Sequence, residues 1–380
     1  MKLPAGFVGA GIAAGIKSSG AQDLALIVNR GPQKFGTAVF TSNQVVAAPV
    51  MWSREVTKDY EVSAVLLNSG GANACTGPEG FADTHRSAEL VAEKLHLNAG
   101  DVVICSTGLI GVRLPMPQML SGIEKAVTNL TEESLRDVAT AIMTTDSKPK
   151  ISTVTHHASF AGIAKGAGML APSLATMLSV VMTDACVTPE SARRIFNEVT
   201  ELTFNRLDSD GCTSTNDTVL FMASGASGIT LSDDELRHGL MTICSDLAHQ
   251  LIADAEGHSK IISIKTINAK SEADAVAIGR ACARNNLLKC ALHGEDPNWG
   301  RILAALGTTS AVFDPQNIDV ALNGIWVCRA SAPGDDRELV DMSNELIEIV
   351  IDLHAGSHEA TIWTNDLTAA YVHENSAYAT

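Results

Sequence analysis

Short runs rich in valine, isoleucine and leucine alternate with longer stretches of helical periodicity along the whole chain. Because sheet faces and helix stripes must each be buried against another layer, this alternation favours a layered α/β fold. The predicted strands are Leu24–Val28, Thr37–Thr41, Ala64–Asn68, Val102–Cys105, Met177–Met182, Val219–Met222, Ile261–Ile267 and Ile318–Leu322. The predicted helices are 78–95, 117–128, 132–144, 189–205, 233–255, 272–286, 298–306 and 337–352. The pattern does not order the strands within a sheet.

Two of these helices carry start signals. Ser232 with Glu235 fits a capping box, and Thr188 before Pro189 fits an N-cap followed by proline at the first helical position. We therefore expect helices to begin at residues 233 and 189.

The size and composition of the chain restrict its core. A chain of 380 residues suggests two domains or one large α/β unit. Hydrophobic residues make up 46% of the chain and aromatic residues only 4%, so the core must be aliphatic. No stretch approaches 18 apolar residues, and no membrane span is predicted.

The charge of the chain is negative and unevenly placed. A net charge of −16 argues against nucleic acids and anionic membranes as partners. Residues 1–175 carry 14 basic and 14 acidic side chains, whereas residues 176–380 carry 13 basic and 29 acidic ones. The two halves of the sequence therefore differ in their balance of charge.

The eight cysteines stand singly, and none forms a CxxC pair, so a zinc ribbon is not indicated. Most lie among apolar or small residues, as reduced core cysteines do, which favours a cytoplasmic protein. His156, His157, His238 and His293 form no metal pattern with neighbouring cysteines or acids, and we predict no metal or other cofactor.

The glycine-rich segment Phe7–Ile16 invites two interpretations that its composition disfavours. Three glycines and no leucine make it a poor signal peptide. A dinucleotide-binding turn would need a strand before Gly9 and an acidic residue about 20 positions further on, but Val28–Gly31 holds none. We therefore expect a tight glycine-rich crossing of the chain.

The segment from Lys165 to Asp184 combines a loop containing glycine and proline with an apolar strand, and Thr176 stands at the junction. This junction coincides with the change in charge. From the pattern alone, Thr176 is either a functional residue or an ordinary start of a strand, where threonine is common.

The run Lys165–Leu178 resembles the self-cleavage site of the ornithine acetyltransferase family, also called glutamate N-acetyltransferase, whose pattern is KGxGM-x-x-P-x-x-ATML. Similar blocks follow one another in order along essentially the whole chain. They are Gly6-Phe7 with Gly15–Lys17, and the segments 47–50, 68–77, 106–111, 143–146, 213–218, 296–301, 363–367 and 375–378.

The resemblance implies a precursor that cuts itself between Ala175 and Thr176, giving an α chain 1–175 and a β chain 176–380. It implies a four-layer αββα sandwich with a smaller additional domain, an N-terminal-nucleophile enzyme, and association as α2β2. Thr176 would take the acetyl group from N2-acetylornithine as an ester and pass it to L-glutamate in a ping-pong reaction. Its freed α-amine, with an unperturbed pKa of about 7.7–8.0, would serve as the general base.

The resemblance also assigns roles to other residues. Thr107 and Gly108 would form the oxyanion hole, although Ser-Thr-Gly after a strand is otherwise an ordinary turn. Glu256 would hold the substrate's ammonium group; without the resemblance, it would be a solvated acidic helix end. The other implied substrate contacts are Lys165 for the α-carboxylate, Thr144 or Thr145, Asn375 and Thr380.

Three alternatives stay open from the sequence. The enzyme could also use acetyl-CoA to acetylate glutamate, which an assay with acetyl-CoA as sole donor would reveal. It could be a self-cleaving aminopeptidase or amidase, which would release acetate without an acceptor. It could be a binding protein that has lost turnover, but intact Thr176, Thr107, Gly108 and Glu256 argue against this.

Overall fold

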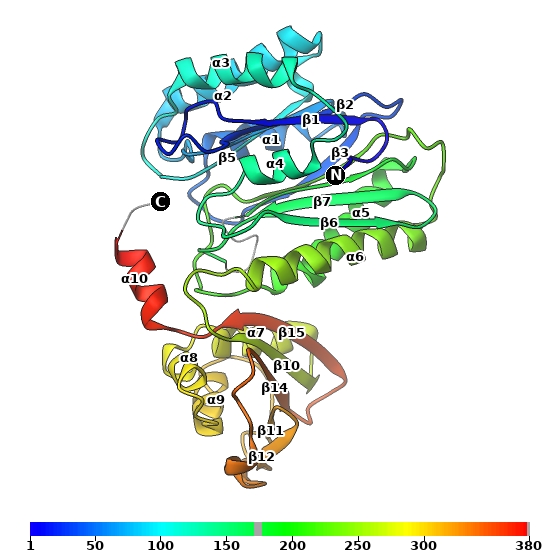
Figure 1. Ribbon diagram of the computed structural model, residues 1–380. Helices are drawn as coiled ribbons and strands as arrows, with labels where there is room; N and C mark the ends of the chain where they lie inside the picture. Colours follow the sequence, from blue (N-terminus) through cyan, green and yellow to red (C-terminus); the bar gives the residue numbers. More distant parts are fainter. Residues whose placement is uncertain (171–176, 378–380) are drawn as a thin grey trace.

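The computed structural model describes residues 1–170 and 177–377. Ala175, Thr176 and Thr380 lie outside the described residues. The chain forms a layered sandwich followed by a smaller domain, which lies below the sandwich in Figure 1.

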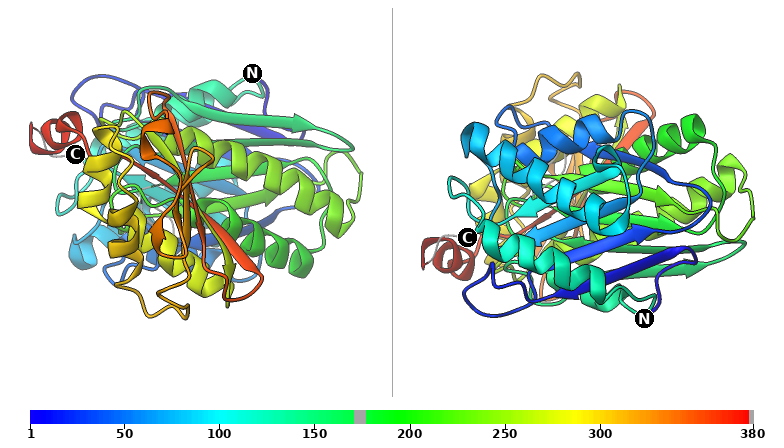
Figure 2. Two further views of the ribbon diagram at one scale, coloured as in Figure 1. Left: turned by 90° about the horizontal axis from the view of Figure 1, so that it is seen from below. Right: turned by 90° about the horizontal axis from the view of Figure 1, so that it is seen from above.

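The first sheet of the sandwich has four strands in the order β1-β2-β4-β5. They are β1 (Phe7–Ile12), β2 (Leu24–Asn29), β4 (Ala64–Ser69) and β5 (Val102–Thr107). Only the pair β4–β5 is parallel. Along β2, Leu24 and Leu26 pack toward α2 (Gly77–Leu95) and α3 (Met116–Thr128), whereas Ile27 faces the second sheet. Figure 2 shows these two helices covering the sheet from above.

The second sheet has five strands in the order β3-β9-β8-β7-β6. They are β3 (Phe35–Phe40), β6 (Lys150–Thr155), β7 (Ser159–Lys165), β8 (Leu178–Thr183) and β9 (Thr218–Ala223). Every residue of β8 and β9 is buried, because this sheet is covered on both faces. Its outer face packs against α5 (Pro189–Leu202) and α6 (Asp233–Ile252).

A shared core of aliphatic side chains lies between the two sheets, and α4 (Leu135–Ala141) contributes to it at one edge. The short helix α1 (Ala48–Val56) packs against β5, where the Ser53 hydroxyl donates to the carbonyl of Ile104. The order helix, sheet, sheet, helix confirms the predicted four-layer αββα sandwich (Figure 1).

The smaller domain follows the sandwich in sequence and has its own core. Its sheet has the order β13-β12-β11-β14-β10-β15. The strands are β10 (Ile261–Ala269), β11 (Asp319–Leu322), β12 (Ile325–Arg329), β13 (Ala332–Pro333), β14 (Leu346–Asp352) and β15 (His358–Asn365). The helices are α7 (Glu272–Ala283), α8 (Asn286–His293) and α9 (Trp299–Leu306), followed by α10 (Ala369–Ala377) at the end of the chain.

All eight predicted strands are confirmed to within two residues at each end, with only small shifts at their boundaries. Seven of the eight predicted helices are confirmed in position. The capping box at Ser232 is present, and Pro189 begins α5 as predicted. Nothing in the sequence pattern had predicted β6, β7, β12, β13, β15, α1, α8 or α10. No helix in the described part of the chain is long and apolar enough to span a membrane.

The predicted helix 337–352 is wrong. The chain makes a single 3-10 turn at Arg337–Leu339 and then the strand β14, which lies between β11 and β10. Ile347, Ile349 and Ile351 are fully buried and alternate with more exposed residues. This period of two is typical of a strand, and it outweighs the helical propensity of the glutamates in the segment.

The glycine-rich N-terminal segment forms strand β1, which the sequence had not predicted. The glycines of β1 allow this strand to lie close to the first residues of α4 and to the residue before that helix. A Cβ atom on Gly11 would lie 2.1 Å from the carbonyl oxygen of Asp137, and one on Gly9 would lie 2.9 Å from Ser134 Oγ. The expected tight crossing is therefore present, within a strand.

Candidate active site

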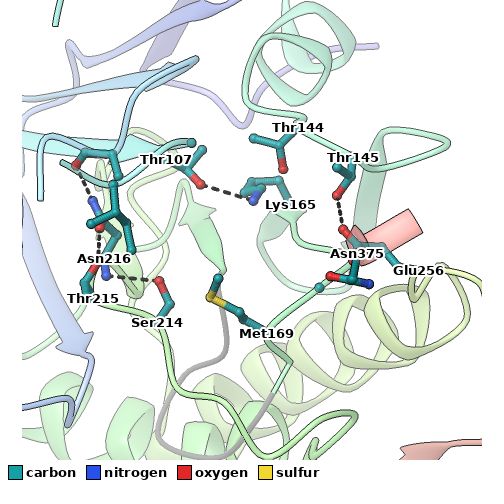
Figure 3. Close-up of a pocket in the computed structure, with 14 residues that line it drawn as sticks. Thr107, Thr144, Thr145, Lys165, Met169, Ser214, Thr215, Asn216, Glu256 and Asn375 are labelled. Carbon is teal, nitrogen blue, oxygen red and sulfur yellow. Dashed lines mark hydrogen bonds between the residues drawn. The ribbon is translucent and has the colours of Figure 1, made fainter. Parts of the chain in front are cut away.

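One pocket at the edge of the sandwich collects seven of the residues that the sequence singled out (Figure 3). They come from the ends of β5 and β7, the segment after α4, the turn after α6, and α10. The lining residues are Ala72, Thr107, Gly108, Ile110, Thr144, Thr145, Lys165, Gly168, Met169, Ser214, Thr215, Asn216, Glu256 and Asn375. The remaining predicted residues, Ala175, Thr176 and Thr380, lie outside the described part of the chain.

Thr107 ends strand β5, and its carbonyl oxygen accepts hydrogen bonds from the N–H groups of Gly70 and Gly71, at 2.9 and 3.0 Å. Because the peptide bond is trans, the N–H of Gly108 points away from these two glycines. Gly108 has a φ of +130°, and a Cβ atom there would lie 2.6 Å from the nitrogen of Gly71. Only glycine fits this position, which fixes the direction of the Gly108 N–H.

Lys165 ends strand β7 and is almost fully buried. Its Nζ donates to Thr107 Oγ1 at 3.2 Å (Figure 3). Burial lowers the pKa of Lys165, and the nearby carboxylate of Asp146 opposes this shift. The pocket therefore contains a buried lysine amine in direct contact with the threonine predicted for the oxyanion hole.

A buried ion network lies next to Lys165 and had not been predicted. Lys150 Nζ contacts Asp146 Oδ1 and Asp254 Oδ2, each at 2.5 Å, and Asp146 Oδ1 also accepts the N–H of Gly166 at 2.7 Å. Burial alone would raise the pKa of Asp146, but Lys165 and Lys150 hold it below its usual value. Asp254 is thus buried and paired. The acidic segment that contains Glu256 is therefore not a solvated helix end at Asp254.

Glu256 lies in a turn beyond the end of α6. Its Oε1 accepts a hydrogen bond from the Thr145 hydroxyl at 2.7 Å, and its N–H donates to the carbonyl of Ala167 at 2.9 Å. A Cβ atom on Gly168 would lie 2.5 Å from Glu256 Oε2, so Gly168 packs directly against this carboxylate. Glu256 thereby joins α6 to the first residues of the predicted cleavage segment.

Thr144 and Thr145 play different parts in the pocket, which the sequence alone could not distinguish. The Thr145 hydroxyl is bound to Glu256, whereas among the described residues the Thr144 hydroxyl has no partner. The backbone N–H of Thr144 donates to Asp146 Oδ2 at 2.9 Å. Thr144 is therefore the one of the two with a hydroxyl available to a ligand.

Asn375 reaches the pocket from the exposed helix α10, where its Nδ2 donates to the carbonyl of Tyr371 in the same helix at 3.0 Å. Sequence reasoning missed Ser214, Thr215 and Asn216, although the polar run before the apolar strand β9 was a usable signal. Asn216 Nδ2 donates to the carbonyls of Ala72 and Ser106, and so ties this run to the first sheet.

The histidines lie apart from the pocket. His156 and His238 are neighbours with ring centres 5.1 Å apart, and His293 Nδ1 lies 2.8 Å from Asp366 Oδ2. Within residues 1–170 and 177–377, no cluster of three or more histidine, cysteine or acidic side chains has a geometry that holds a metal ion.

Comparisons with known proteins give the family. The sequence matches the ArgJ family over residues 9–380. It is 58% identical to the arginine biosynthesis bifunctional protein ArgJ of Streptomyces coelicolor over 375 residues, which is 98% of each chain. Among solved structures, the ArgJ protein of Bacillus halodurans is 32% identical with a TM-score of 0.50, over 52% of this chain and 98% of that one. The ornithine acetyltransferase of Mycobacterium tuberculosis, complexed with ornithine, is 48% identical with a TM-score of 0.41, over 44% of this chain and 92% of that one. The resemblance seen in the sequence is thus confirmed, and this chain belongs to the ArgJ family.

Proposed function

We propose that this protein transfers an acetyl group from N2-acetylornithine to L-glutamate through an ester on Thr176, after cutting its own chain between Ala175 and Thr176. The products of the cut are the α chain 1–175 and the β chain 176–380. The observation that carries the proposal is the gathering of seven candidate residues, from distant parts of the chain, around one pocket. Membership of a family whose relatives are named for arginine biosynthesis supports acetyl transfer in that pathway.

The ends of the cleavage segment support a nucleophile at this pocket. Strand β7 ends at Lys165 and β8 begins at Leu178, and these two residues are register partners in adjacent strands. The chain therefore leaves the sheet beside the pocket and returns to the same place, where Thr176 is bonded to Met177. The match to the Bacillus halodurans structure covers nearly all of that chain but half of this one, as expected for a chain that has been cut.

Self-cleavage needs no reactant other than the chain itself and water. The Thr176 hydroxyl attacks the carbonyl carbon of Ala175, the peptide C–N bond breaks, and the hydroxyl proton passes to the nitrogen, which becomes the new α-amine. Water then hydrolyses the resulting ester and restores the hydroxyl, leaving a carboxylate on Ala175. Placement of the hydroxyl next to its own upstream carbonyl supplies a high effective concentration.

Acetyl transfer repeats this chemistry on a substrate. The α-amine of Thr176 takes the hydroxyl proton while the oxygen attacks the acetyl carbonyl, and the proton then passes to the departing amine of ornithine. The amine of glutamate then attacks the acetyl ester on Thr176, N-acetylglutamate leaves, and the Thr176 hydroxyl is restored. Each half-reaction forms a tetrahedral oxyanion that fixed donors must stabilise.

The contact between Lys165 and Thr107 suits Thr107 for this task. An ammonium group only donates hydrogen bonds, so Thr107 Oγ1 must accept in this contact, and its own hydrogen stays free to donate. The hydroxyl of Thr107 and the N–H of Gly108 would then be two donors at the end of one strand. Lys165 also supplies the positive charge that the α-carboxylate of either substrate requires.

Loss of the negative charge at Glu256 should separate transfer from cleavage. Glu256→Gln keeps the acceptor for Thr145 but removes the charge that would face a substrate ammonium group. We expect kcat/KM for acetyl transfer to fall about 10- to 100-fold, because a charge-assisted hydrogen bond is replaced by a neutral one. Self-cleavage should be unchanged, because the precursor contains no substrate.

The matched control is Glu345→Gln, which alters a carboxylate of similar type that lies outside the pocket, beside His258. Electrophoresis gives the cleaved fraction of each variant, and initial rates give kcat/KM. A Glu256→Gln protein that stays uncut although folded would assign this residue to processing instead of substrate binding.

The direct test of the proposed function is mass spectrometry of the purified protein. We expect two chains, the second beginning Thr-Met-Leu-Ser. Incubation with N2-acetylornithine and no glutamate should add about 42 Da to the β chain at Thr176, as covalent catalysis requires, and glutamate should remove it. An active enzyme whose β chain never carries acetyl would exclude the covalent route. Free acetate released without an acceptor would indicate an amidase.

The word "bifunctional" in the names of the relatives favours a second activity, the acetylation of glutamate from acetyl-CoA. Acetyl-CoA as the sole donor in the same experiment distinguishes an enzyme with both activities from one that only recycles the acetyl group. We further propose that the protein acts in the cytoplasm and that the cleaved chains associate as α2β2, as the sequence resemblance implies.

A further inference from the structure

Met177 is the first described residue after the cleavage segment, and both its backbone polar groups are bound. Its N–H donates to Asp217 Oδ1 at 2.8 Å, and its carbonyl accepts from the N–H of Thr218 at 3.1 Å. Its side chain is buried in the core between the second sheet and α5 and α6. The N–H, the carbonyl and the side chain of Met177 are therefore all in contact with the rest of the protein.

The carboxyl group that binds Met177 is unusual. Asp217 is fully buried just before β9, and its Oδ2 atom has no hydrogen-bond partner among the described residues. Burial raises the pKa of Asp217 well above its usual value, although the hydrogen bond from Met177 and the charge of Lys165 act against this shift. A buried carboxyl group with one oxygen unpaired among the described residues costs stability, so its retention calls for another role.

The segment that carries Asp217 is itself firmly placed. The carbonyl of Asp217 accepts the N–H of Thr41 at 3.0 Å, and the Thr41 hydroxyl donates to the carbonyl of Ser214 at 2.6 Å. Neighbouring Asn216 is bound to two carbonyls of the α half, as described above. The backbone around Asp217 is therefore restrained by hydrogen bonds, and Asp217 in turn restrains Met177.

Cleavage changes how Thr176 is held. A residue within a chain is restrained from both sides, whereas the first residue of a chain is restrained only by the residue that follows it. After the cut, Thr176 is the first residue, and Met177 is its only covalent neighbour. Nucleophilic catalysis tolerates little misplacement, since an error of about 1 Å can cost roughly 100-fold in rate.

We propose that Asp217 is a positioning residue for Thr176: by binding the N–H of Met177, it orients the nucleophile of the cleaved chain at the pocket. This inference rests on the proposed function, in which Thr176 carries the acetyl group. Asp217 does not touch the substrate in this role. It acts through the backbone of the residue next to the nucleophile.

The test compares Asp217→Ala with Asp217→Asn. Alanine removes the acceptor, and we expect kcat per cleaved chain to fall about 10- to 100-fold, with little change in KM for either substrate. Self-cleavage should also slow, because the same contact orients the hydroxyl in the precursor. Asparagine keeps an acceptor oxygen and the size of the carboxyl group, so Asp217→Asn should retain kcat within about threefold.

The chain offers a matched control after β8, the strand that Met177 precedes. Asp184 is also buried, follows β8, and accepts one backbone N–H, that of Ser159, at 2.8 Å. Asp184→Ala should lower the unfolding temperature without changing kcat per cleaved chain. Thermal unfolding, cleavage half-time, kcat and KM are measured for all three variants.

A loss of kcat in Asp217→Ala that Asp217→Asn restores, and that Asp184→Ala does not share, supports the inference. Wild-type kcat in Asp217→Ala overturns it, and the acetyl ester on Thr176 would then still be found, so the proposed function would stand. If Asp217→Ala does not fold, Asp217→Asn decides: kcat below a tenth of wild type overturns the positioning role, and kcat near wild type supports it. If wild-type Thr176 never carries acetyl, the proposed function fails and the inference fails with it.

Discussion

The Thr176→Ala protein is expected to remain a single chain of about 39.9 kDa that neither takes up nor transfers an acetyl group. Alanine has no hydroxyl to attack the carbonyl of Ala175 or the acetyl donor, so both reactions lose their nucleophile. Transfer activity should fall below detection, and the folded state should be preserved. Denaturing electrophoresis and an assay of N-acetylglutamate formation check the two outcomes separately.

Thr176→Ser completes this comparison, because serine keeps the hydroxyl but lacks the methyl group that restricts χ1. We expect it to cut itself more slowly and to keep part of the activity. The control is Thr183→Ala at the far end of β8, where a buried threonine donates to the carbonyl of Ser159. That variant should be cut and active. A Thr176→Ala protein that is fully active as one chain would disprove the proposed nucleophile.

Replacement of Lys165 by methionine should give the second-largest loss. The variant keeps an unbranched side chain of nearly the same length at this buried position, but it removes the donor to Thr107 and, in the proposed mechanism, the cation for the substrate carboxylate. We expect kcat/KM to fall about 100- to 1,000-fold, as for the loss of an oxyanion donor, because the Thr107 hydroxyl would lose the contact that orients it as such a donor. Steady-state kinetics of the cleaved fraction measure this loss.

The pH profile provides a signature of the same residue. In the proposed mechanism Lys165 acts in its charged form, and burial lowers its pKa, so wild-type activity should fall as the pH rises through that lowered value. The charged groups that influence it are Asp146, Lys150, Asp217 and Glu256. Activity should also fall on the acid side, where the Thr176 amine becomes protonated. Lys165→Met should lose the alkaline fall and keep the acid one.

Lys260→Met is the matched control for Lys165→Met. Lys260 is a buried lysine outside the pocket, bound to Glu295 and to the backbone carbonyls of Met342 and Asn344. Its replacement should lower stability and leave kcat/KM per folded enzyme unchanged. Equal losses of kcat/KM in the two variants would show that the effect of Lys165 is structural.

The sequence was a good guide wherever one physical signal dominated. The strands of the sandwich are short apolar runs, because both faces of β8 and β9 are covered, and such runs stand out against the surrounding loops. Strand β6 escaped prediction because two of its buried positions, Lys150 and Ser152, are polar, so KISTVT contains no apolar run. Strand β14 escaped because the glutamates of the segment 337–352 favour a helix, whereas the period of two within the strand is short.

The site was predicted as a set of residues but not as an arrangement. The motifs named Thr145 and Glu256, yet their hydrogen bond joins residues 111 positions apart and depends on the packing of the whole sandwich. The network of Lys150, Asp146 and Asp254 had no sequence signal either, because isolated charges along a chain do not reveal their partners. Asp217 stood within a motif, but only its burial and its contact with Met177 indicate a role.

The order β3-β9-β8-β7-β6 of the second sheet places the two strands from beyond residue 176 between strands from before it. Both ladders that cross this boundary are continuous, six residue pairs between β3 and β9 and six between β7 and β8. A cut between β7 and β8 therefore divides the covalent chain without opening the sheet. Once cut, the protein can fold again only if two separate chains meet, so a unimolecular reaction becomes a bimolecular one. The intact precursor would be the only form that folds at a rate independent of concentration. After the cut, each molecule would depend on keeping the fold in which it was cut.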